Sequence, residues 1–463
     1  MSIPVIPVTR YKVTFQPLSR TDVYDAVIDV SDRVEISGIK NIRKSIDSGD
    51  YDIGVYTFDD ISIKGFNDDG FFNDSEDSRS MFITTRDRTK VIVEFLQLTL
   101  DSNGSEVEVS TISFRGLINE EATRANIITD NIVFRVLSRD SVIRNTKVSS
   151  GAITNGTSIK NAMFQILSNS RITSVLGVSL SNINPDLDIT IDDGSDFNDK
   201  PTNDAINEMA LVSNSVMIID SSDNVIIKSR DEDETKNVLN LFGKGDIHGR
   251  ENIITITKYN TGQHRMFTSV IFNGREKSDG PISSEFGLRQ KSITLPFITL
   301  NATEDLIAAR LLKEFKAPKI ELNLKIPTRI ANGVDLLDRV SVNYPLRLKP
   351  PLGSTFMPVI GVTKIGSTTE LLPDTFGSIE IPDNLAFKVI EITENPTTFE
   401  TLFKLRQIGT ELNDGVFNIP GSAIVGFAIV GEAVLQVDTA ESAVATWSPG
   451  IVGGGQIGLS KIA

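Results

Sequence analysis

The chain has 463 residues, which is too long for one hydrophobic core and fits two to four domains. Hydrophobic residues make up 40% and charged residues 23%, so the composition is that of a folded protein and not of a disordered one. The net charge of −15 argues against a general nucleic-acid-binding surface, and the lack of cysteine excludes disulfides, thiolate nucleophiles and Cys-based zinc sites.

Residues 1–150 have the pattern of β-strands. Segments such as YKVTF, KVIVEFLQLTL and EVEVSTISFRG are rich in Val, Ile, Phe and Thr, and turn clusters such as DSNGSE separate them. Several short strands in succession predict a β-barrel or a β-sandwich as the first domain, over residues 1–150.

An acidic loop is predicted within this region, at NDDGFFNDSEDS (residues 67–78). Closely spaced carboxylates suit Ca²⁺, but their spacing does not match the calcium-binding loop with its terminal Glu. We therefore favour a solvated turn and expect no metal.

Residues 151–250 predict an α+β domain between two β regions. In SIKNAMFQILSNSR, apolar residues recur at helical spacing, with Thr157 or Ser158 available as the N-cap. A second helix is expected over residues 204–212, followed by a hairpin in SVMIIDSSDNVIIKSR. The predicted buried face of the first helix consists of Ile159, Ala162, Met163, Ile166 and Leu167.

Residues 251–410 predict a second β-barrel domain that contains one helix. Its strands are expected in NIITITKY, MFTSVIFNG, IELNLKI and AFKVIEIT. The helix is expected in TEDLIAARLLKEFKA, with acids in its first turn and a stop before Pro318. The residues predicted on its buried face are Leu306, Ile307, Leu311, Leu312 and Phe315.

Few residues suggest catalysis. The two histidines, His248 and His264, are sixteen positions apart and fit no HExxH or HxH metal motif. The sequence has no GxxxxGK[ST] phosphate loop and no GxSxG nucleophile elbow. We expect no enzyme activity, no catalytic residue and no cofactor, although two of the many carboxylates could still converge as in glycoside hydrolases.

Residues 411–463 form an apolar, glycine-rich C-terminal segment, in which GSAIVGFAIVGEAVL repeats Gly every five residues. The uninterrupted apolar run is shorter than the roughly 20 residues that span a bilayer, so no stable membrane insertion is predicted. Three pentads are also too few for a solenoid. Two readings stay open, a β-segment buried in its own domain and a docking segment for a partner protein. The candidate docking residues are Ile424, Val425, Phe427, Ile429, Val430, Val434 and Leu435.

The order of these pieces resembles the baseplate hub and tail-tip proteins of tailed bacteriophages. The resemblance lies in VEISGIKNIRKSIDSGDYDIGVYTFDDISIKGFNDDGFF, ISFRGLINEE and IVFRVLSRDSVI, then in the helix and hairpin of INEMALVSNSVMIIDSSDNVIIKSRDED, and in the strands from NIITITKY to LDRVSVNYPLRLK. It covers roughly residues 20–350 as an order of elements.

The resemblance implies a structural virion protein of the tail tip, made in the host cytoplasm, with no catalytic residue. It implies a homotrimer in which two barrels per subunit build a pseudo-sixfold ring, matching a threefold tip to a sixfold tube. The implied partners are tail-tube and distal-tail proteins, the tape-measure protein, and distal tip, spike or fibre proteins. DNA would pass through the ring without specific binding, which suits an acidic protein. A hexameric distal-tail adaptor and a carbohydrate-binding or adhesive β-protein are the alternatives.

Overall fold

The computed structural model describes residues 9–18, 24–39, 41–46, 57–69, 71–72, 85–100, 105–126, 131–220, 222–230, 240–243, 253–260, 265–316, 319–347, 378–381, 386–408, 434–436 and 444–446. The chain divides into two units. The first contains Met1–Asn240, Asn252–Val340 and Phe387–Gln407, and the second contains Leu241–Glu251, Ser341–Ala386 and Ile408–Ala463.

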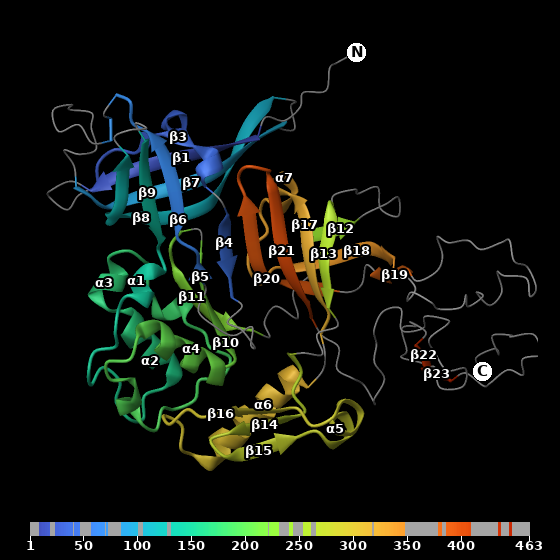
Figure 1. The fold of residues 1–463 in the computed structure, drawn as a ribbon. Coiled ribbons are helices and arrows are strands. Elements are labelled where there is room, and N and C mark those ends of the chain that lie inside the picture. Colours follow the sequence, from blue (N-terminus) through green and yellow to red (C-terminus); the bar gives the residue numbers. More distant parts are fainter. Residues whose placement is uncertain are drawn as a thin grey trace, which may run out of the picture. The chain divides into compact units, whose positions relative to one another are not determined.

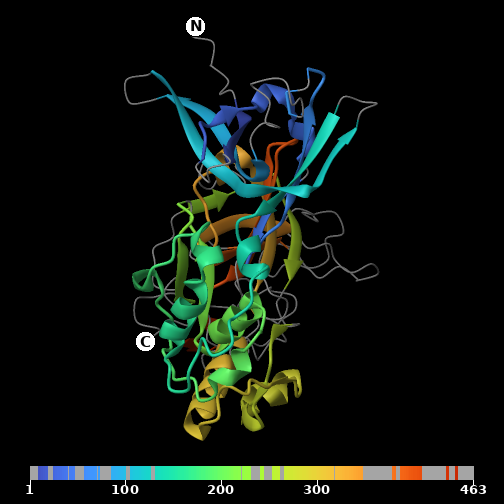
Figure 2. The same cartoon turned by 90° about the vertical axis from the view of Figure 1, so that its left-hand side faces the viewer.

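The first unit begins with a seven-stranded antiparallel sheet in the order β2-β1-β7-β8-β9-β6-β3, which curls into a half-barrel (Figures 1 and 2). The expectation of a mainly β protein is confirmed. Two 3-10 turns, η1 (Ser31–Arg33) and η2 (Ile36–Gly38), accompany the sheet. The strands are β1 (Thr9–Leu18), β2 (Ile28–Asp29), β3 (Val34–Glu35), β6 (Ile61–Phe66), β7 (Thr85–Leu100), β8 (Glu106–Asn126) and β9 (Asn131–Ser138).

The concave side of this sheet carries an aromatic core, because strand alternation directs every second residue inward. The Phe15 and Phe134 rings lie 5.3 Å apart and nearly perpendicular, and Phe72 lies 5.0 Å from Phe134. All three side chains are buried. Such edge-to-face contacts add to the stabilisation from the buried apolar area.

The described part of the predicted acidic loop is a turn tied into this core. Asn67 Oδ1 accepts a hydrogen bond from the Phe72 amide at 2.8 Å, and Asp69 accepts one from the Phe71 amide at 3.1 Å. Asp69 also accepts a 2.7 Å hydrogen bond from Arg33. The Arg33 guanidinium lies 4.3 Å from the centre of the Phe71 ring. Asp69 therefore stabilises the geometry of the turn. The remainder of residues 67–78 lies outside the described ranges.

An α+β module follows, and its predicted elements are confirmed. In α2 (Ile159–Leu167) the five predicted apolar residues are all buried, and Ser158 caps the helix by accepting from the Asn161 amide. The second helix is α4 (Thr202–Val212), and the hairpin is formed by β10 (Ser215–Ile219) and β11 (Val225–Ser229). The short elements are α1 (Ser141–Arg144), α3 (Ser170–Thr173), η3 (Leu180–Asn182) and η4 (Gly194–Phe197).

Residues 265–316 form a small layer in which α6 (Asn301–Phe315) packs on a three-stranded sheet in the order β15-β14-β16. The strands are β14 (Ser269–Phe272), β15 (Arg275–Ser278) and β16 (Gln290–Ile293), and α5 (Gly280–Phe286) precedes β16. One predicted face residue was wrong, because Leu306 is 48% exposed. Its neighbours at i+3 and i+4, Ala309 and Arg310, lie outside the fully buried stripe formed by Glu304, Ile307, Ala308, Leu311, Leu312 and Phe315.

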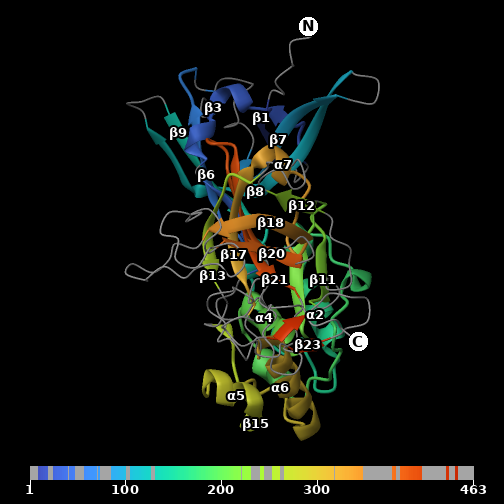
Figure 3. The ribbon, with the colours of Figure 1, turned by 90° about the vertical axis from the view of Figure 1, so that its right-hand side faces the viewer.

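The second large sheet of the first unit is antiparallel in the order β13-β17-β21-β20 (Figure 3). Its strands are β13 (Thr255–Asn260), β17 (Glu321–Pro327), β20 (Ala386–Asn395) and β21 (Glu400–Gln407), and α7 (Thr328–Ala331) follows β17. Strand β4 (Ile42–Ser45) pairs with β20 and with β5 (Thr57–Phe58), although both lie in the segment predicted as the first barrel. The predicted domain limits themselves stay a prediction.

In the second unit, β19 (Ser378–Ile381) pairs antiparallel with the later residues of β18 (Arg339–Arg347). Strand β12 (Asn240–Gly243) begins at the last residue of the first unit's opening segment. A further antiparallel pair joins β22 (Val434–Gln436) to β23 (Val444–Thr446). No helix within the described ranges is both long and apolar enough to cross a bilayer.

Candidate functional site: a polar junction around strand β8

The seven-stranded sheet and the second large sheet, called the first and second sheets below, meet at a bulge in β8. Opposite β7, Phe114 pairs with Val93 and Ile112 pairs with Glu94, which leaves Ser113 as an extra residue. A bulge changes the direction of a side chain, and Ser113 Oγ here donates a 2.9 Å hydrogen bond to Glu394 Oε1 on β20. The Tyr11 hydroxyl on β1 donates to the same oxygen. One carboxylate of the second sheet is therefore held by two strands of the first.

Aromatic rings surround this contact. Tyr11 lies 5.4 Å from Phe95 and 5.6 Å from Phe399, measured between ring centres. Burial raises the pKa of Glu394, which the hydrogen bonds from Tyr11 and Ser113 partly offset. Burial also raises the pKa of Tyr11. The carboxyl group lines a cavity of about 50 Å³, whose polar lining is Lys44, Thr111, Ser113, Thr328, Asn332, Glu394 and Thr401.

Two residues further along β8, the sheet binds the hairpin of the α+β module. Arg115 NH1 donates to Asp223 Oδ2 at 2.7 Å, and Arg139 forms an ion pair with the same oxygen. Asp223 lies in the hairpin turn at φ +65°, a left-handed conformation that Asp tolerates better than most residues. Burial lowers the pKa of Arg139 to about 10, and the neighbouring Arg115 adds to the decrease. The hairpin turn thus fits between two arginines.

The hairpin turn is itself prearranged. Asp220 Oδ1 accepts hydrogen bonds from the amides of Ser222 and Asn224, both at 2.8 Å. Asp220 and Asp223 of this turn line a second cavity of about 70 Å³, which shares Lys44, Ile112 and Ser113 with the first. The Asp220 carboxylate therefore fixes the conformation of the DSSDN turn, whereas Arg115 and Arg139 fix the position of the turn against the sheet.

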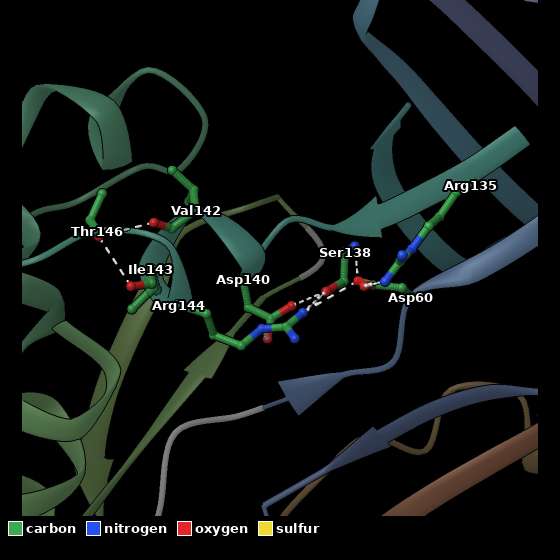
Figure 4. A network of polar contacts seen from close by, with 8 residues as sticks. All are labelled: Asp60, Arg135, Ser138, Asp140, Val142, Ile143, Arg144 and Thr146. Atoms are coloured by element: carbon green, nitrogen blue, oxygen red, sulfur yellow. Dashed lines mark hydrogen bonds and ion pairs between the residues drawn. The ribbon is translucent and has the colours of Figure 1, made fainter. Parts of the chain in front are cut away.

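A second network joins the end of β9 to α1 (Figure 4). Asp60 accepts from the Ser138 amide at 3.1 Å and from Arg144 at 3.3 Å, and Arg135 reaches it at 3.5 Å. Ser138 Oγ donates to Asp140, whose other oxygen lies 3.3 Å from Arg144 Nε. Figure 4 shows these side chains converging between the end of β9 and the first helix of the module.

Strand β4 adds a third connection. Arg43 donates two hydrogen bonds to Glu391 on β20, at 2.9 and 3.0 Å, in the bidentate geometry that suits Arg and a carboxylate. Lys44 on the same strand forms an ion pair with Asp335. Residues from early in the chain are therefore bound to residues near its end.

These contacts explain what the junction can do. Glu394, Asp223 and Glu391 are bound by hydroxyl or guanidinium groups that other elements contribute, so each of these carboxylates links two modules. Both cavities are far smaller than the roughly 300–1,000 Å³ of typical ligand sites. Within the described ranges, no three His, Cys, Asp or Glu side chains are grouped as metal ligands. The arrangement is suited to holding modules in fixed register.

The predicted docking residues are only partly covered by the structure. Val434 and Leu435 lie on β22, where they pair with Thr446 and Ala445 of β23. The other five, Ile424, Val425, Phe427, Ile429 and Val430, lie outside the described residues, as do His248 and His264. Docking through this segment stays a prediction.

Sequence analysis missed the residues of the junction. Its hairpin prediction placed DSSDN in a turn, but no local pattern pairs Asp223 with Arg115, 108 positions away. The one available signal was the position of Arg115 and Arg139 at or beside strands otherwise rich in Val, Ile and Phe.

No protein-family model matches the sequence, and no curated protein matches it either. Solved structures do. The tail protein from Neisseria meningitidis MC58 aligns with 86% of this chain and 97% of its own length, at a TM-score of 0.50 and 10% identity. The 43 kDa tail protein of prophage MuSo2 from Shewanella oneidensis aligns over 85% and 97%, at a TM-score of 0.46 and 10% identity. A chain of the Francisella PdpA–VgrG complex aligns over 86% and 58%, at a TM-score of 0.44 and 9% identity. The resemblance to tail proteins is thus confirmed for the fold, through the Neisseria protein.

Proposed function

We propose that this protein is a structural hub of a phage tail tip or baseplate, with no enzymatic role. The observation that carries the proposal is the likeness to the Neisseria tail protein, which includes nearly the whole of that protein and 86% of this chain. A match of this extent covers the succession of modules along the chain and is not limited to one sheet.

The polar junction supports a structural role. Ser113 and Arg115 of β8 bind Glu394 of the second sheet and Asp223 of the α+β module, so one strand fixes two partners. In a homotrimer, two sheets per subunit would supply six positions of a ring. Such a ring needs the two sheets of each subunit to keep a constant register, because closure with defined symmetry depends on it.

The ring we propose continues the tail tube and forms part of the conduit for genome ejection. The net charge of −15 suits a passage along which DNA slides, since a negative wall repels phosphate. A structure of the assembled ring would test this by showing which side chains line its lumen. A lumen lined by Lys and Arg would contradict the proposal. The proposed neighbours are tail-tube and distal-tail proteins, the tape-measure protein and the distal tip, spike or fibre proteins.

Mass measurement of the purified chain in solution tests the assembly. Three subunits per particle is the expected result. Six would favour the distal-tail adaptor, and a monomer that binds sugars would favour an adhesive protein. An image of the assembled tail labelled on this chain tests the location, and a label anywhere other than the tip or baseplate would overturn the proposal.

A further inference from the structure

We propose that Glu394 carries a proton while the first and second sheets are in contact, so that this contact is a proton-dependent latch. The latch consists of Glu394 on β20, Tyr11 on β1 and Ser113 at the bulge of β8. Docking of the sheets takes up one proton from solvent, and their separation returns it. The inference does not depend on the proposed function.

The surroundings of Glu394 offer hydroxyl groups and little positive charge. Tyr11 from β1 and Ser113 from β8 donate to it, and the cavity beside it is also lined by Lys44 from β4 and by the hydroxyl-bearing side chains of Thr111 on β8, Thr328 on α7 and Thr401 on β21. The Thr328 and Thr401 hydroxyls are bonded to each other at 3.1 Å. Lys44 is the one cation among them, and its ammonium group is bound to Asp335. An ionised Glu394 would therefore lack a cation of its own.

The two hydrogen bonds to Glu394 end on the same oxygen. Tyr11 and Ser113 both donate to Oε1, which leaves Oε2 to carry a proton. The cavity also presents an acceptor, because the buried Oδ1 of Asn332 has no hydrogen-bond partner in the described structure. A protonated carboxyl group adds a donor beside this unpaired acceptor, which an ionised carboxylate cannot do. The direction of the Glu394 pKa, raised by burial, agrees with this geometry.

The sign of the pH effect follows from linkage. A carboxyl whose folded pKa lies above its unfolded value contributes stability that is complete below the unfolded pKa and is lost as pH rises through the folded one. The ordinary value is 4.5. Relative to a Glu394→Gln variant, which keeps a neutral polar group, the wild-type contact should therefore weaken as pH rises above about 4.5.

The test is unfolding of the full chain over a pH series, comparing wild type with Glu394→Gln and with Glu108→Gln as an exposed control on β8. For each unit by which docking raises the pKa of Glu394, the folded-to-unfolded ratio of wild type should fall about tenfold relative to Glu394→Gln between acid and neutral pH. A difference between these two proteins that is constant across pH, or that changes in the opposite direction, would overturn the proposal.

Native-state hydrogen exchange locates the effect. Wild type and variant are compared at the same pH, so the intrinsic exchange rate cancels. Protection of residues 110–114 and 391–395 should fall with rising pH in wild type only.

If Glu394→Gln does not fold, Ser113→Ala provides the second route. Loss of this donor to the carboxylate should move the pH response to higher pH than in wild type. Ser110→Ala should not move it, because the Ser110 hydroxyl, on an exposed part of β8, donates to Glu94 of β7. An unmoved response in Ser113→Ala would also contradict the latch.

Discussion

Arg115 and Asp223 are 108 positions apart in the sequence, yet their side chains meet at 2.7 Å where the first sheet binds the hairpin of the α+β module. Because Arg139 reaches the same oxygen, removal of this one carboxylate leaves two guanidinium groups without their shared anion. The pair therefore offers a direct test of the junction.

Asp223→Asn should lower the free energy of unfolding by about 3 kcal/mol, the lower end of the range for breaking a buried ion pair, since the Arg115 and Asp223 side chains remain 23% and 16% exposed. Asn tolerates the left-handed turn, so the backbone is retained. Urea denaturation measures the change. The control is Glu108→Gln, which removes the exposed pair with Arg10 and should change stability by less than about 1 kcal/mol. Equal effects of the two variants would argue against the junction.

Gly116 on β8 lies against the backbone of β9. A Cβ at this position would be 2.5 Å from the Leu137 carbonyl oxygen and 2.7 Å from both Phe114 and Val136. Gly116→Ala should therefore destabilise the protein by about 1–3 kcal/mol through overpacking. Gly280→Ala is the matched control, because a Cβ there meets nothing within 4 Å. Thermal unfolding of both variants measures the difference, and a neutral Gly116→Ala would mean that the two strands separate easily.

Neighbouring residues of α6 should respond very differently to truncation. Ile307 is 1% exposed and Leu306 is 48% exposed. Ile307→Ala should lower the free energy of unfolding by about 2–5 kcal/mol through a lost core contact and a cavity. Leu306→Ala should stay within about 0.5 kcal/mol of wild type. A large effect of Leu306→Ala on the isolated subunit would contradict the packing of α6 described here.

Glu314 should give a pH dependence opposite to that of Glu394. Although burial acts to raise it, the cations Lys319, Arg230 and Lys388 hold the pKa of Glu314 below its ordinary 4.5. Lys319 Nζ lies 3.0 Å from Glu314 Oε1 and Arg230 lies 3.5 Å from it. A depressed folded pKa contributes stability above the unfolded pKa, which is lost as pH falls through the folded value.

Glu314→Gln should therefore be less stable than wild type at about pH 7, and the gap should close as pH falls below about 4.5. Unfolding midpoints at a series of pH values measure the gap. Lys319→Met removes one of the cations, so the pKa of Glu314 should rise. The loss of stability on acidification should then begin at a higher pH than in wild type. A gap of constant size from neutral to acid pH would show that Glu314 contributes by packing alone.

The C-terminal segment can be tested by deletion. If it docks a partner, removal of residues 415–463 should leave the proposed trimer intact and weaken attachment of a more distal tip component. Particle mass and co-purification of tip proteins measure the two effects separately. Failure of the shortened chain to fold would favour the alternative that the segment completes a core.

Local patterns predicted the helices and the hairpin well. The buried face of α2 could be derived from Ile159, Met163 and Ile166 because a helix fixes its own periodicity. Leu306 was misplaced because a helical pattern gives the apolar residues, but the partner sheet decides how wide the buried stripe is. The assignment of short strands needed tertiary contacts, and IRKS of β4 has no apolar alternation to mark it.

The junction was less predictable still. A bulge such as that at Ser113 depends on the register of two strands, which the sequence of one strand does not contain. Tyr11 and Glu394 are 383 positions apart and gain their roles only when both sheets are in place. Residues whose function is to join modules have little local signature, because their partners define them.

The pairing of β4 with β20 has a consequence for how the chain is made. Arg43 and Glu391 are 348 positions apart, so at typical rates of about 5–20 residues per second a ribosome needs roughly 20–70 s to pass from one to the other. β4 can pair with β5 early, but its second edge stays open until β20 emerges. The nascent chain must therefore carry an unpaired strand edge through most of its synthesis, which exposes this segment of newly made subunits to premature pairing with one another.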